Sequence, residues 1–194
     1  MKRRIPLTSR RIELDYNAPF ILSFSLACAL AYFAAVITRG WVLDAVFSIG
    51  PNFSFARPLT WPGLLLHPLG HESVQHLSIN LAVILLIGPL IEEKYGTVPL
   101  LGMALVTALL TGLISGLFFA KGLMGASGIA FMLIVLSSFT NVRAGTVPLT
   151  FVLVVLLYLG NEFITAFRDD DISQFAHIMG GLCGGWFGYR FGRS

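Results

Sequence analysis

Long stretches without charge alternate with short polar segments along this chain. Six stretches contain no Asp, Glu, Lys or Arg: 16–38, 73–91, 95–120, 122–142, 144–161 and 172–189. A helix needs about 20 mostly apolar residues to cross the hydrocarbon core of a bilayer. The pattern therefore predicts an all-α fold, a compact bundle of six transmembrane helices, at about 18–38, 71–92, 97–119, 127–140, 147–166 and 173–190.

The segment between the first two expected helices, 39–71, is apolar but interrupted by prolines and glycines. These residues argue against a full span, because proline breaks the helical hydrogen-bond pattern and glycine weakens a helix. Trp41 and Trp61 suit the membrane interface. We expect a partly helical first outer loop that is half embedded in the bilayer.

The composition and the charges agree with a membrane protein. Hydrophobic residues make up 56% of the chain and charged residues only 12%, against about 25% charged in soluble domains. With the N-terminus inside, nine of the 13 Lys and Arg residues lie on the inner side and four outside. This bias predicts a multi-pass protein of the inner (plasma) membrane with both termini cytoplasmic. Because membrane topology accounts for the positive charge, we expect no nucleic-acid partner. We expect a short cytoplasmic tail, 1–17, and one six-helix membrane domain, 18–194.

The second expected helix carries polar side chains that are costly inside a membrane and therefore suggest function. They are His71, His76 and Asn80. His76 and Asn80 are four residues apart, so they share one face of the helix. We expect that face to direct an imidazole and an amide into the bundle.

Three histidines, at 67, 71 and 76, also raise the possibility of a zinc site. A catalytic zinc usually takes three protein ligands and keeps one open position. Pro68 and Gly70 argue against the early helix start that would bring these three rings together. We therefore expect neither a metal nor a cofactor, and we expect His67 at the membrane interface.

A serine and a histidine lie near the outer ends of the fourth and sixth expected helices. Ser127 opens its helix within Gly125-Ala-Ser-Gly128, where the small neighbours permit close approach and the helix-start N–H groups point towards negative charge. His177 precedes glycines repeated every four residues, at 180, 184 and 188, a spacing that lets helices pack closely. The sixth helix can therefore press His177 towards Ser127, and a Ser–His pair is how a weak hydroxyl nucleophile is activated. Candidate donors to an oxyanion are the Ser127 N–H, the Asn80 amide and the His76 ring.

Taken together, these residues resemble the rhomboid family of intramembrane serine proteases, in its bacterial six-helix form. The resemblance rests on His71, His76 and Asn80, on 125–128, and on Ala176-His177-x-x-Gly180-x-x-x-Gly184. The turn that contains Glu92 is also similar. The resemblance covers about residues 60–190.

The resemblance implies a serine endopeptidase that cleaves transmembrane substrates within the bilayer through a Ser127–His177 dyad. It further implies that His76 and Asn80 assist the oxyanion and that His71 lies near the mouth of the site. Many bacterial members stack a tyrosine on the catalytic histidine, four residues after the serine. This chain has Phe131 there, which keeps the ring and lacks the hydroxyl. The alternative is a non-catalytic rhomboid-like protein that binds transmembrane clients; such proteins usually lack the serine or the histidine.

Overall fold

The computed structural model describes residues 16–50, 53–119, 122–139 and 171–192, together with 149, 152–153 and 156. Within them, three helices are long and apolar enough to cross a membrane: α1 (Pro19–Ile37), α4 (Val74–Tyr95) and α5 (Thr97–Phe118). Two further helices are α6 (Ser127–Ser137) and α8 (Asp171–Phe191). The bounds predicted for these five helices are correct to within three residues. The fifth expected helix, 147–166, lies almost entirely outside the described residues, so six spans stay a prediction.

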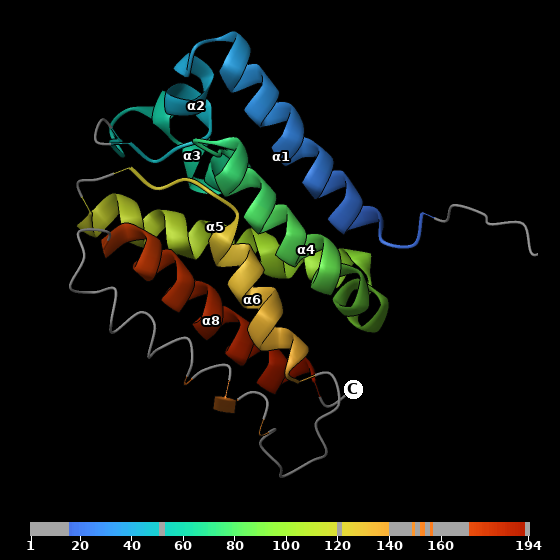
Figure 1. Cartoon of the computed structure of the whole chain (residues 1–194). Helices are drawn as coiled ribbons and strands as arrows, with labels where there is room; N and C mark the ends of the chain where they lie inside the picture. The colour runs from blue at the N-terminus through green and yellow to red at the C-terminus, as the bar shows by residue number, and fades with distance from the viewer. Residues whose placement is uncertain are drawn as a thin grey trace, which may run out of the picture.

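The described part of the chain is all-helical, as predicted. Its one extended pairing is an isolated bridge between Ile49 and Leu123. Figure 1 shows α1 beside α4, and α8 running along α6, with α5 behind them. Cys28 and Cys183 are buried and are free thiols.

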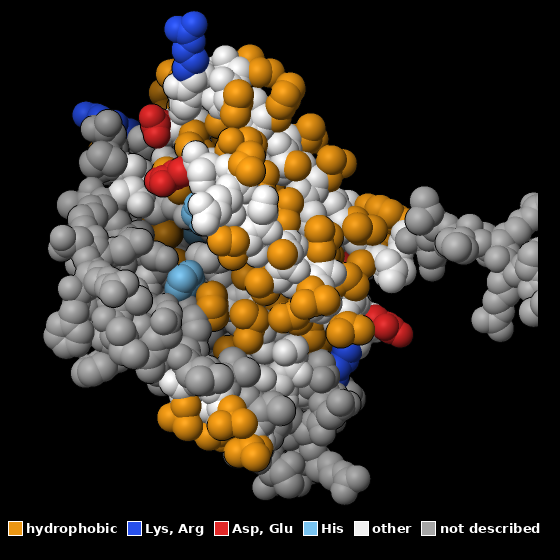
Figure 2. Space-filling model, in the orientation of Figure 1, with side chains coloured by type: hydrophobic (Ala, Val, Ile, Leu, Met, Phe, Trp, Pro, Cys, Tyr) orange, Lys and Arg blue, Asp and Glu red, His pale blue; other side chains and the backbone are white. Residues whose placement is uncertain are grey.

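The outer surface of this bundle is apolar between two charged ends. Leu26, Leu30 and Phe33 of α1 and Leu86 of α4 are exposed, Leu86 to 76%. Figure 2 shows hydrophobic side chains covering this face, with acidic and basic side chains gathered towards its two ends. Soluble monomers rarely expose such a continuous apolar surface. A bilayer is the solvent that suits it.

Glu92 joins the end of α4 to the start of α1. Its carboxylate accepts hydrogen bonds from the Phe20 N–H at 2.8 Å, the Ile21 N–H at 2.9 Å and the Thr97 hydroxyl at 2.7 Å. The first N–H groups of a helix have no partner within the helix, and no side-chain cap is present at Ala18, the residue before α1. A carboxylate from a distant helix therefore caps α1, although it is only 3% exposed.

Replacing Glu92 with alanine should lower the free energy of unfolding by about 3 kcal/mol, because it leaves buried N–H groups without an acceptor. The thermal unfolding midpoint in mild detergent should fall accordingly. Glu93→Ala is the matched control, since Glu93 is the exposed neighbour of Glu92 on the same helix. Equal midpoints for the two variants would contradict this role.

Among the described helices, the most extensive packing joins α6 and α8, and glycines make it possible. A β-carbon at Gly180 would collide with the Gly128 carbonyl, and one at Gly184 would lie 2.5 Å from the Met132 carbonyl oxygen. One at Gly188 would collide with the Phe139 ring. The close approach predicted from the glycine spacing is confirmed.

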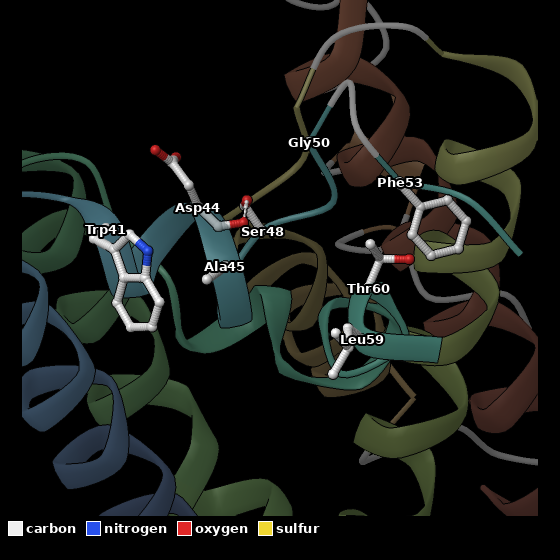
Figure 3. A pocket seen from close by; sticks show the side chains of 8 residues that line it. All are labelled: Trp41, Asp44, Ala45, Ser48, Gly50, Phe53, Leu59 and Thr60. Atoms are coloured by element: carbon white, nitrogen blue, oxygen red, sulfur yellow. Dashed lines mark hydrogen bonds between the residues drawn. The ribbon is translucent and has the colours of Figure 1, made fainter. Parts of the chain in front are cut away.

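The segment between α1 and α4 is partly helical, as predicted. It contains α2 (Trp41–Val46), η1 (Pro58–Thr60), α3 (Gly63–Leu66) and η2 (His67–Leu69). A cavity of about 570 Å³ lies between α2 and η1, with Trp41 and Asp44 on one side and Leu59 and Thr60 on the other (Figure 3). This cavity includes none of the candidate catalytic residues. The exposed Trp41 and Leu59, at 69% and 89%, agree with a loop that meets lipid.

Candidate active site

Ser127 is the first residue of α6 and is half-buried. Two residues before it, Gly125 has a φ of +111°, a conformation that L side chains rarely adopt. This turn leads the chain into α6. The first N–H groups of α6, like those of any helix, have no partner within the helix. A hydroxyl at such a position lies beside donors that favour negative charge.

The outer loop holds the residues that precede Ser127 at three points. Ile49 and Leu123 exchange two backbone hydrogen bonds of 2.9 Å, and the Gly125 N–H donates to the His67 carbonyl at 2.9 Å. The Ala126 N–H donates to Nε2 of His71 at 3.4 Å. These bonds join the outer loop directly to the turn that presents Ser127.

His71 is a buried link within this connection. Its Nδ1 lies 3.2 Å from the Leu69 carbonyl, so Nδ1 carries the proton and Nε2 accepts from Ala126. Burial lowers the pKa of His71 to about 4, which keeps the ring neutral and able to accept. Its side chain is only 1% exposed, and its place near the mouth of the site, which the resemblance implies, stays a prediction.

His67 is buried as well, and its expected position at the membrane interface is wrong. It is 3% exposed, and its Nε2 lies 3.2 Å from the Ala108 carbonyl of α5. Burial lowers the pKa of His67 to about 4. Its backbone carbonyl also supports Gly125. Sequence reasoning missed this role because a backbone carbonyl leaves no residue-specific signal.

His76 and Asn80 face the turn before Ser127 from α4, as their spacing predicted. A β-carbon on Gly125 would lie 2.8 Å from two His76 ring atoms and 3.8 Å from Nδ2 of Asn80. The His71 and His76 rings meet edge to face at 5.0 Å. The Asn80 amide nitrogen is buried and has no hydrogen-bond partner among the described residues. A buried donor without a partner is costly, and such a group beside a helix start is suited to bind developing negative charge.

His177 lies against Phe131 on α6. The two ring centroids are 4.5 Å apart, with the planes tilted by 39°. Phe131 follows Ser127 by four residues and so shares its face of α6. One turn after His177, Gly180 contacts the carbonyl of Gly128, the neighbour of Ser127. The fold therefore brings Ser127 and His177 to facing turns of α6 and α8, with His76 and Asn80 beside the helix start.

Figure 2 shows histidine side chains at the surface, close to acidic side chains near one end of the face that it presents. His76 and His177 are half-buried, whereas His67 and His71 are buried. The candidate catalytic and oxyanion histidines are therefore partly exposed, while the two histidines that support the turn are enclosed.

Comparisons with known proteins identify the family of this chain. Residues 58–194 match the family model of the rhomboid domain. The chain is 25% identical over 180 residues to the rhomboid protease GlpG of Haemophilus influenzae, an alignment that covers 91% of this chain and 92% of that protein. Together with the apolar helices, the match over most of the chain establishes a membrane protein. The chain belongs to the rhomboid family.

Proposed function

We propose that this rhomboid-family protein is a serine endopeptidase that cleaves transmembrane segments within the bilayer. Ser127 is the nucleophile and His177 the general base. The observation that carries the proposal is the contact between His177 and Phe131, on the helix face that also carries Ser127. The name of the H. influenzae relative, a rhomboid protease, supports the same activity.

In the proposed reaction, His177 takes the Ser127 proton while the serine oxygen attacks the scissile carbonyl. The resulting tetrahedral intermediate collapses as His177 returns the proton to the leaving amine, which produces an acyl-enzyme. Water then attacks the ester by the same route, with His177 again as base, and releases the acid product. No carboxylate is needed in this two-residue scheme.

Negative charge on the carbonyl oxygen is stabilised in this scheme by donors at the start of α6. These are the Ser127 N–H, the Asn80 amide and the His76 ring. The Asn80 amide nitrogen, which is buried and has no partner among the described residues, supports this assignment, because such a donor needs no rearrangement to bind an oxyanion. Phe131 holds the imidazole plane in place of the tyrosine common in bacterial relatives.

The substrates are transmembrane proteins, and the site faces the outer half of the plasma membrane with both termini cytoplasmic. The opposite end of the helices carries Lys94 and Arg190, which supports this orientation by the positive-inside rule. Six transmembrane helices complete the proposed architecture, with the fifth at 147–166.

A fluorophosphonate probe tests the proposal directly, because it reacts with an activated serine. The purified wild-type protein should be labelled, and Ser127→Ala should not be. Ser138→Ala, which changes a serine just after α6, should be labelled like the wild type. A folded wild-type protein that neither reacts nor cleaves would instead fit a non-catalytic binder of transmembrane clients.

Replacing Asn80 with alanine should lower kcat by about 10–10³-fold, the range for losing one oxyanion donor. KM should change less, because the charge forms only in the transition state. Steady-state kinetics on a reporter transmembrane substrate separates the two constants. Gln75→Ala is the matched control, an exposed amide on the same helix. An unchanged kcat in Asn80→Ala would remove Asn80 from the site.

A further inference from the structure

Another cavity lies at the end of the bundle opposite Ser127. Its volume is about 510 Å³, and it forms where α4 ends, α5 begins and α8 ends. Lys94, one of its lining residues, donates a 3.1 Å hydrogen bond to the carbonyl of Phe139, which follows the last turn of α6. Because Ser127 is the first residue of that helix, the cavity and the candidate active site lie at opposite ends of α6.

The long wall of the cavity is apolar. Pro99, Met103 and Val106 line it from α5, and Phe187 lines it from α8. Pro99 and Val106 are seven residues apart, which is about 10 Å along a helix axis. A groove of this kind, parallel to membrane helices, has the shape and chemistry of a segment of lipid acyl chain.

The inner end of the cavity is polar and positively charged. Lys94 contributes an ammonium group, and the Arg190 guanidinium lies 5.5 Å from the ring centroid of Phe191, another lining residue. The Tyr95 hydroxyl is buried and has no hydrogen-bond partner in the described part of the protein. A phenol is a hydrogen-bond donor, and leaving it buried and unpaired is costly. The cavity therefore offers positive charge and an unused donor at one end of an apolar groove.

Exposed aromatic side chains lie near the end of α8, and one of them, Trp186, lines the cavity. Trp186 and Tyr189 of α8 are 58% and 66% exposed. Such residues favour the level of the lipid headgroups. The charged end of the cavity, next to the end of α8, therefore suits headgroup depth, and the wall formed by Pro99, Met103 and Val106 extends from there along α5.

We propose that this cavity binds one anionic phospholipid of the inner leaflet. The acyl chain lies along α5, the phosphate lies near Lys94 and Arg190, and the Tyr95 hydroxyl donates to a phosphate or ester oxygen. Basic pockets between transmembrane helices on the cytoplasmic side are suited to such headgroups. The lipid would join α4, α5 and α8 at the end of the bundle that carries no catalytic group.

Quenching of Trp186 by brominated lipids tests this inference in reconstituted bilayers. The chain has three tryptophans, so Trp41→Phe and Trp61→Phe leave Trp186 as the reporter. Dibrominated phosphatidylglycerol or dibrominated phosphatidylcholine is titrated into a phosphatidylcholine bilayer. Half-maximal quenching of Trp186 should need a mole fraction of dibrominated phosphatidylglycerol at least about fivefold lower than that of dibrominated phosphatidylcholine. This factor is expected for one basic residue near an anionic headgroup.

Two substitutions in this background identify the binding groups. Tyr95→Phe removes only the hydroxyl, and Lys94→Gln removes the charge; each should abolish most of the preference for phosphatidylglycerol. Tyr189→Phe, an exposed tyrosine on α8, should retain it. Tyr95→Phe remains informative if Lys94→Gln loosens the contact with Phe139, because the Tyr95 hydroxyl has no protein partner in the described residues. Equal quenching by both lipids, or a preference that survives both substitutions, would overturn the proposal.

Discussion

Replacing His177 with alanine should abolish cleavage, lowering kcat/KM by about 10³-fold or more. The serine hydroxyl is a weak nucleophile, and no other imidazole faces Ser127 from α8. His177 packs on Phe131 at 4.5 Å, so the loss removes the proposed base from the face of α6 that carries the nucleophile. The measurement is cleavage of a reporter transmembrane substrate in proteoliposomes.

Ile178→Ala is the control for this variant. Ile178 is the next residue on α8 and is 41% exposed, so truncating it changes a surface side chain on the same turn. It should keep near wild-type cleavage. A His177→Ala protein with an unchanged unfolding midpoint and near wild-type activity would show that the base lies elsewhere in the chain.

The Gly180→Ala variant should have a kcat/KM about 10²-fold lower than the wild type. Moving a catalytic group by about 1 Å is enough to lower a rate by about this factor. A β-carbon there would collide with the Gly128 carbonyl, and both chain segments at that contact are backbone. The helices must therefore separate, and His177 moves away from Ser127 with α8. Gly180→Ala should also lower the thermal unfolding midpoint.

Gly185→Ala separates this effect from a general effect of glycine on helix stability. A β-carbon at Gly185 would have no neighbour within 4 Å, and the residue lies on the same helix. Alanine has the higher helix propensity, so this variant should be at least as stable as the wild type and fully active. Equal activity in both variants would mean that close packing at Gly180 does not position His177.

The two ends of the bundle have different roles in this picture. At one end, the outer loop joins the turn before Ser127 through Ile49, His67 and His71. At the other end, Glu92 caps α1, and Lys94 bonds to the chain after α6. The proposed nucleophile, Ser127, thus lies on a helix whose far end is held by a separate contact. Substitutions at Glu92 should therefore lower the free energy of unfolding without directly changing the proposed catalytic residues.

The positions of the helices could be predicted from the sequence because a bilayer imposes a simple rule. Every backbone group must be paired inside the membrane, so a long charge-free stretch becomes a helix. The start at Ser127 also followed from local chemistry, since Gly125 needs a positive φ that ends the preceding segment. The contact of α8 with α6 followed from glycines at a four-residue spacing, because only backbone without side chains can approach that closely.

The places of His67, His71 and Glu92 were decided only by the tertiary structure. Each pairs with a group far away in the chain: His67 with Ala108, His71 with Ala126, and Glu92 with Phe20 and Ile21. All of these partners are backbone N–H or C=O groups, which every residue type carries, so no residue at the receiving end marks the contact. A buried polar group must be paired, but which backbone group pairs with it depends on how the outer loop and the helices pack together.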